Sequence, residues 1–217
     1  MTSSQASWVL LVLKHKRNMT VAQVFFASSN HGKVLEVRSI LREVMPTLHV
    51  YSLQDFPDWS QQVEESSQTY HDNALLKARA YQDNPRHLPV IADDSGLEVA
   101  ALPGLLGIHS QRWYQGKELT KAQALLQKLK GVQDRSMVFH TTFCYLAPSQ
   151  PPQFFEGDLP GSAALELAGG DGFDYDPIFV PQGFKQTYAE LGETTKNRIS
   201  QRRAALESLA IYLQNSQ

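Results

Sequence analysis

A strand–helix–strand pattern in the first quarter of the chain constrains the fold most. Residues 21–27 are apolar and β-prone, which is typical of a buried strand. Five apolar residues then recur at helical spacing: Val34, Val37, Ile40, Leu41 and Val44. This spacing predicts a helix from about residue 31 to residue 45, before Pro46. A second short strand over residues 48–53 follows, so the chain is expected to be an α/β protein.

The later chain adds further helices and strands. A polar loop through residues 58–68 precedes a predicted helix at about 69–81. A strand at 88–92 is expected to run into a turn at 93–96. The remaining predicted elements are an apolar stripe at 119–129, long strands at 137–147 and 153–167, and a last helix at about 196–213. We expect a mixed β-sheet flanked by helices, with the middle strands forming a second lobe and a cleft between the lobes.

Composition excludes several classes of protein. The 217 residues carry a formal net charge of −2, whereas a protein that binds duplex nucleic acid through its phosphates is usually basic. The single cysteine, Cys144, excludes an intramolecular disulfide scaffold and a cysteine-rich zinc site, and it fits a reducing, cytoplasmic compartment. We expect no nucleic-acid partner.

The N-terminal residues stand apart from this pattern. The apolar run at residues 8–13 is far shorter than the about 20 residues that span a bilayer, so no membrane partner is expected. Residues 1–19 are interpreted as an N-terminal extension of uncertain role, with Met19 as an alternative start. Residues 20–217 are expected to form a single catalytic domain.

The segment from Ser28 to Lys33 joins the first strand to the first helix. Backbone N–H groups at a helix start favour an anion, and two hydroxyls, an amide and a lysine add further donors. The alternative is a capped helix start with a solvated lysine.

Adjacent carboxylates follow the apolar run at residues 88–92. Asp93 and Asp94 should point to opposite sides of the backbone, and carboxylate oxygens suit Mg²⁺, which often bridges to substrate phosphates. Glu65, from the polar loop, is a candidate to complete the metal shell. The alternatives are a turn in which the aspartates cap backbone N–H groups and, for Glu64 and Glu65, a solvated acidic loop.

Two later segments offer groups for a ligand. Phe173, in a glycine-rich loop, could stack on a base, and Asp176 could accept base N–H groups. Lys196 and Arg202 could reach the ligand from the start of the last helix. The alternatives are aromatic core plugs for the first segment and a solvated helix face for the second.

Taken together, the motifs resemble the inosine triphosphate pyrophosphatase family. Six segments occur in the family's order: FASSNHGK (26–33), NALLKAR (73–79), IADDSGL (91–97), GIHSQR (107–112), GFDYDPIF (172–179) and ISQR (199–202). Each is short, but six in order over about residues 21–213 form a specific signal.

The resemblance implies an elongated α/β fold with a central cleft, usually assembled as a homodimer. It implies Mg²⁺-dependent cleavage of purine nucleoside triphosphates between the α- and β-phosphates, giving a nucleoside monophosphate and pyrophosphate. The preferred substrates of the family are inosine, deoxyinosine and xanthosine triphosphates, so the implied role is to clear deaminated purines from the nucleotide pool.

The resemblance also implies roles for single residues. Asp94 would be the general base and a Mg²⁺ ligand, with Glu65 as the other carboxylate near the metal and Asp93 in support. The residues implied for phosphate or sugar are Ser28, Ser29, Asn30, His31, Gly32, Lys33, Lys77 and Ser95. Phe173 would stack on the base, and Arg112 would bind phosphate or brace the cleft. The remaining substrate-binding residues are Asp174, Tyr175, Asp176, Lys196, Gln201 and Arg202.

Three positions depart from the family pattern. Ser28-Ser29 replaces Thr-Gly, Asp174 replaces a glycine and would add charge near the base, and Gln201 replaces a histidine thought to read the 6-oxo group. A glutamine can satisfy a 6-oxo or a 6-amino group, so the hypothesis is that activity survives while discrimination against ATP weakens. The alternative functions are a nucleotide-binding protein with little turnover and a related pyrophosphatase with another base selectivity.

Overall fold

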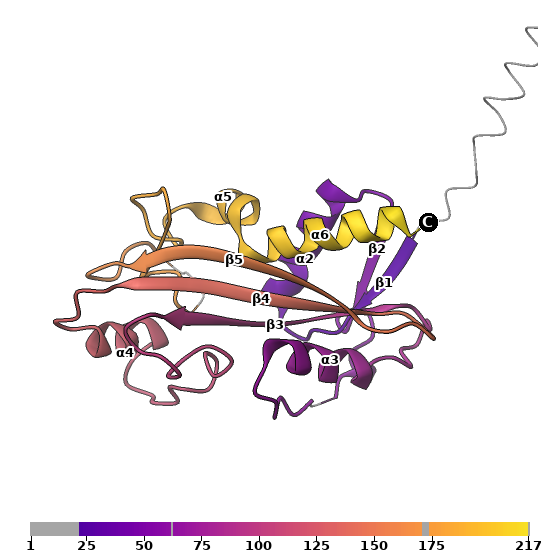
Figure 1. Cartoon of the computed structure of the whole chain (residues 1–217), viewed down its shortest axis with the longest axis horizontal. Helices are drawn as coiled ribbons and strands as arrows, with labels where there is room; N and C mark the ends of the chain where they lie inside the picture. The colour runs from indigo at the N-terminus through magenta and orange to yellow at the C-terminus, as the bar shows by residue number, and fades with distance from the viewer. Residues whose placement is uncertain (1–21, 62, 171–173, 217) are drawn as a thin grey trace, which may run out of the picture.

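The structure is a computed structural model that describes residues 22–61, 63–170 and 174–216. The expected N-terminal extension, residues 1–19, lies outside these ranges. Figure 1 shows an elongated molecule in which long strands run along the longest axis and helices lie above and below them.

One six-stranded sheet forms the centre of the molecule. Its strands are β1 (Ala22–Phe26), β2 (Leu48–Ser52), β3 (Val90–Val99), β4 (Ser136–Leu146), β5 (Gln153–Ala163) and β6 (Phe179–Pro181). The strand order is β2-β1-β3-β4-β5-β6. β1 runs parallel to β2 and β3, whereas the β3–β4, β4–β5 and β5–β6 pairs are antiparallel. The expected mixed sheet flanked by helices is therefore confirmed.

Five α-helices and one short 3₁₀ helix accompany the sheet in the described ranges. They are α2 (His31–Val44), the 3₁₀ helix η1 (Pro57–Trp59), α3 (Tyr70–Ala80), α4 (Lys121–Lys128), α5 (Gly192–Ile199) and α6 (Gln201–Asn215). In the part of the chain that the structure describes, no helix is both long and apolar enough to cross a membrane.

Adjacent residues of β3 show how the helices divide between the two faces. Ile91 packs in a core cluster with residues of α2 and α6, whereas Ala92 packs with Ala74 and Ala78 of α3. Alternation along a strand sends neighbouring side chains to opposite faces, so α2 and α6 cover one face and α3 covers the other. Further along β3, Leu97 joins a third cluster with Leu125 of α4.

The structure corrects the expected strand ends. β3 does not stop at Ala92 and turn at residues 93–96: it continues to Val99, and Asp93 and Asp94 pair with Phe143 and Thr142 of β4. The carboxylates had suggested a turn, but buried cations compensate them within the strand. β5 ends at Ala163, four residues before the expected end.

The expected last helix is two helices. α5 ends at Ile199, and Ser200 has extended backbone angles (φ −63°, ψ 151°). The Ser200 side chain accepts a hydrogen bond from the backbone N–H of Arg203 and so caps α6. Arg198 and Arg202 therefore lie on different helices and do not share the i, i+4 face that one continuous helix would give them.

Candidate active site

The turn between β1 and α2 forms one wall of a cavity. Asn30 caps α2, because its Oδ1 accepts a hydrogen bond from the backbone N–H of Lys33 at 3.1 Å. The backbone N–H of Asn30 donates to Ser28 Oγ at 3.3 Å. The N-terminal end of a helix attracts an anion, and Lys33 in its first turn adds a positive charge. Ser29 is not among the described non-glycine residues with positive φ, so its side chain causes no backbone strain.

The two aspartates lie where one edge of β3 is left open. Within the described ranges, β1 pairs with β3 only at Val90 and Ile91. The next partner on that edge within the described residues is Gly107, which bridges to Leu97. Asp93 and Asp94 fall between these contacts, and their side chains leave the strand on opposite faces. A ligand at this edge can therefore meet both.

Asp93 joins three other polar groups on the α2/α6 face. Its Oδ2 accepts from Lys33 Nζ and Ser95 Oγ, each at 2.8 Å, and lies 3.7 Å from Arg202 Nε. Burial alone would raise the pKa of Asp93, but Lys33 and Arg202 outweigh it and hold the pKa well below its usual range. Asp93 is therefore a fixed negative charge that orients two cations and a hydroxyl.

Asp94 belongs to a separate cluster on the α3 face. Lys77 Nζ donates to Asp94 Oδ1 at 3.0 Å and to Glu65 Oε1 at 3.1 Å. Asn73, which is fully buried, donates to Asp94 Oδ2 at 3.2 Å. Burial raises the pKa of Asp94 even though Lys77 opposes the rise. A carboxylate that holds its proton more readily than usual suits a general base.

The Asp94 cluster fits a divalent cation. Carboxylate oxygens of Asp94 and Glu65 converge on a single positive atom, Lys77 Nζ, so the fold already places a cation between them. Within the described ranges no group of three or more histidine, cysteine or acidic side chains is poised to hold a metal. Mg²⁺ commonly uses one or two carboxylates and completes its shell with water and substrate phosphates, so two protein ligands suffice.

The first turn of α6 adds two residues. Arg202 Nη1 donates to Glu36 Oε2 of α2 at 2.8 Å, and this contact joins the two helices beside Asp93. Gln201 is 4% exposed, and its Oε1 is buried without a hydrogen-bond partner among the residues that the structure describes. Gln201 is the first residue of α6, because α5 ends at Ile199 and Ser200 caps the next helix.

The loop after β5 forms the far end of the cavity. The Tyr175 hydroxyl donates to the backbone carbonyl of Ser110 at 2.6 Å. Asp176 forms an ion pair with Lys196 of α5, and Lys196 Nζ lies 4.9 Å from the centre of the Tyr188 ring. Phe173, the expected stacking residue, lies outside the described residues.

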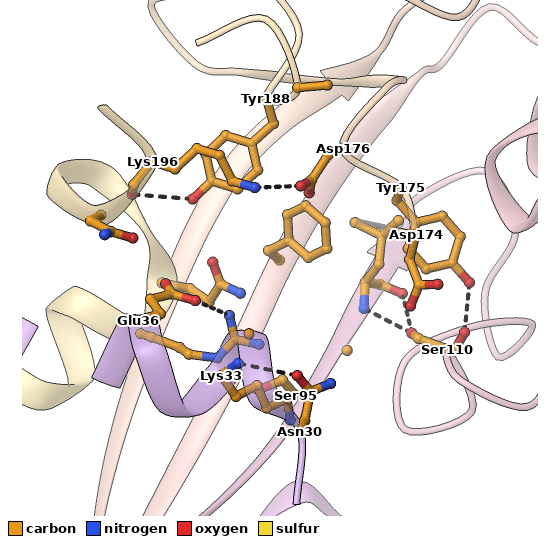
Figure 2. Close-up of a pocket in the computed structure, with 18 of the residues that line it drawn as sticks. Asn30, Lys33, Glu36, Ser95, Ser110, Asp174, Tyr175, Asp176, Tyr188 and Lys196 are labelled. Carbon is orange, nitrogen blue, oxygen red and sulfur yellow. Dashed lines mark hydrogen bonds and ion pairs between the residues drawn. The ribbon is translucent and has the colours of Figure 1, made fainter. Parts of the chain in front are cut away.

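These groups surround a cavity of about 460 Å³. Figure 2 shows Asn30, Lys33 and Ser95 together on one side, with Asp174, Tyr175 and Asp176 on another. Ten predicted residues line it: Asn30, Gly32, Lys33, Ser95, Asp174, Tyr175, Asp176, Lys196, Gln201 and Arg202.

The other predicted residues are not in its lining. Ser28 and Ser29 belong to the turn before α2, and His31 is the first residue of that helix. Asp94, Glu65 and Lys77 form the cluster on the α3 face. Arg112 Nη1 donates to the backbone carbonyl of Glu65 at 3.0 Å and so braces the loop of the candidate metal ligand.

Several site residues were missed from the sequence. Glu36, Gln111 and Tyr188 line the cavity, and Asn73 binds Asp94. Asn73 and Gln111 stand inside two of the six motifs, which was an available signal. Glu36 follows Lys33 by three residues and so shares a helix face with it. No pattern identified Tyr188.

The cavity joins an end with Lys33 and Arg202, beside Asp93 at an open strand edge, to an end with Asp174 and Tyr175. This arrangement defines an α/β protein built to hold a phosphorylated small molecule. The chain belongs to the Ham1 family, whose model matches residues 24–212.

Individual relatives agree with this assignment. The dITP/XTP pyrophosphatase of Porphyromonas gingivalis is 38% identical over 198 residues, which cover 88% of this chain and 97% of the relative. The dITP/XTP pyrophosphatase of Bacillus licheniformis is 38% identical over 196 residues, with the same coverage. The solved Ham1 protein of Staphylococcus aureus superposes with a TM-score of 0.76 at 34% identity, covering 90% of this chain and 100% of that one.

Proposed function

We propose that the chain hydrolyses non-standard purine nucleoside triphosphates (ITP, dITP and XTP) between the α- and β-phosphates, giving a nucleoside monophosphate and pyrophosphate. The observation that carries this proposal is the open edge of β3, where Asp93 and Asp94 lie among Lys33, Lys77 and Arg202. The names of the relatives support the same activity.

Each residue at that edge has a distinct task. Lys33 and the N-terminus of α2 bind phosphate oxygens, and Arg202 adds positive charge from α6. Asp93 holds Lys33 and Ser95 in place. Asp94 accepts the proton of the attacking water.

Asp94 and Glu65 would hold Mg²⁺, which would offset the negative charge of the phosphates. The charges of the site favour a metal-bound substrate. Lys33, Lys77 and Arg202 face four carboxylates, those of Glu36, Glu65, Asp93 and Asp94. The protein therefore supplies no excess of positive charge for a triphosphate, and the metal makes up the difference.

We further propose that the described domain acts as a homodimer in the cytoplasm, and that residues 20–217 form one catalytic domain. The family resemblance supports the dimer, and the single cysteine fits a reducing compartment.

The proposal is tested by pyrophosphate release with Mg²⁺ from ITP, XTP, GTP and ATP. ITP and XTP should be cleaved fastest, and Asp94→Asn should lower kcat by about 10²-fold or more, because the general base is lost. Asp83→Asn is the matched control, since Asp83 is exposed and lies outside the cavity lining. Tight binding of nucleotide without release of pyrophosphate would instead favour a binding protein.

A further inference from the structure

The two ends of the cavity present different polar side chains. Lys33 and Arg202 place positive charge at one end, next to the N-terminus of α2. Asp174 and Tyr175 line the other end (Figure 2). If the proposed function holds, the triphosphate occupies the end with Lys33 and Arg202, and the nucleobase lies toward Asp174.

Asp174 belongs to a closed group of three side chains, which we call the Asp174 triad: Asp174, Gln111 and Lys121. Asp174 Oδ2 accepts from Gln111 Nε2 at 2.8 Å and from Lys121 Nζ at 3.2 Å. Lys121 Nζ also donates to Gln111 Oε1 at 2.8 Å. The triad links the loop after β3, the first residue of α4 and the loop after β5. The side chains of Lys121 and Asp174 are only 19% and 20% exposed.

We infer that the ion pair between Asp174 and Lys121 sets how the cavity discriminates neutral from anionic nucleobases. Hypoxanthine has one ring carbonyl and is neutral at pH 7. Xanthine has two, and the second stabilises the anion, so a substantial fraction of xanthine is negatively charged at the same pH. A carboxylate in the lining repels that anion, and Lys121 offsets the repulsion.

The two halves of the pair should therefore act in opposite directions. Asp174→Asn removes the negative charge, so the kcat/KM for XTP should rise relative to that for ITP. Lys121→Met leaves Asp174 without its counter-charge, so the same ratio should fall. Each change should be about 3- to 10-fold, the size expected for one unit charge several Å away in a partly solvated cleft. The double variant should behave like Asp174→Asn.

The choice of variants keeps the fold intact. Asp174 has φ +42°, in the left-handed region, which asparagine tolerates well. Methionine retains most of the apolar stem of Lys121. Lys128→Met is the matched control, because Lys128 is an exposed lysine near the other end of α4. It should leave the XTP-to-ITP ratio unchanged.

The ratio of kcat/KM for XTP to that for ITP depends on the charge of the Asp174 triad, whereas pyrophosphate release itself tests the proposed hydrolysis. If the triad served only as a structural clasp, both variants would lower the kcat/KM for the two nucleotides together, and an unchanged ratio would overturn the inference. The ratio of the Kd of XMP to that of IMP provides a second readout that needs no turnover. Absence of pyrophosphate release would count against the proposed function, whereas this ratio would still test the role of the Asp174 triad.

Discussion

Gln201 and Arg202 are the residues of the site whose polar atoms are least satisfied. Among the described residues, Gln201 Oε1 and Arg202 Nε are buried without a hydrogen-bond partner, although Arg202 Nε lies 3.7 Å from Asp93 Oδ2. A buried polar atom of this kind costs about 1–3 kcal/mol, which a ligand or a small rearrangement can recover. No hydrogen bond to Oε1 fixes the orientation of the Gln201 amide, so the group is free to present either its donor or its acceptor.

Gln201→His should therefore sharpen selection at the base. The glutamine amide can turn over, so it can donate to a 6-oxo group or accept from a 6-amino group. A neutral imidazole that donates to the 6-oxo group uses one ring nitrogen, and that nitrogen cannot also act as an acceptor. We expect the ratio of kcat/KM for ITP over ATP to rise by about tenfold, the effect of one hydrogen bond. Steady-state kinetics with both nucleotides measures it, and an unchanged ratio would contradict this reading of Gln201.

At the scale of elements, the sequence predicted helices better than their interruptions. The expected helices at residues 31–45 and 69–81 correspond to α2 and α3, because polar N-caps (Asn30 and Thr69) precede clear apolar periodicity. The break at Ser200 was not visible, because no proline or glycine marks it and a serine is also found inside helices. Ser200 acts as a cap because α5 and α6 pack on different parts of the core: Ile199 against the α4 cluster and Leu206 against the α2 cluster.

The contact between β5 and α6 gives a prediction at this scale. A Cβ at Gly157 would lie 2.0 Å from the carbonyl oxygen of Gln201, so Gly157→Ala must push the start of α6 away from the sheet. We expect a loss of about 1–3 kcal/mol in the free energy of unfolding. Urea denaturation measures it.

Gly170→Ala is the matched control, because a Cβ there would meet no atom of the described residues within 4 Å. Its effect should stay within about 0.5 kcal/mol. Equal stabilities for the two variants would show that α6 is not held against Gly157.

For the molecule as a whole, the sequence predicted the α/β class and ten of the residues that line the cavity, but not the open edge of β3 at which the site lies. Asp93 and Asp94 were expected to face opposite ways, and their separate partners, Lys33 and Lys77, agree with that expectation. The open edge between them depends on how far β1 pairs with β3, which is a contact between distant segments. Local patterns carry no information about where such a pairing ends.

The reactivity of the Cys144 thiol measures how stably β4 is held in the sheet. It lies in β4 with no exposed surface, and burial raises the pKa of its thiol to about 12. The native protein should therefore react very slowly with a thiol reagent at pH 8, and one thiol per chain should become reactive in denaturing urea. The reaction is followed by absorbance with a disulfide reagent. Rapid stoichiometric labelling in native buffer would mean that β4 is accessible without unfolding.

The continuous sheet also limits how the protein can move. β3 has ten residues, and β4 and β5 have eleven each. β4 pairs with β3 and with β5 along nearly its whole length, so the paired strands continue from one end of the molecule to the other. The halves flanking the cavity thus cannot swing as rigid bodies about a loop, since that would tear many backbone hydrogen bonds. Admission of a nucleotide and release of its products must therefore use twisting of the long strands or movement of the connecting loops and α5. Changes in those loops or in α5 should alter turnover.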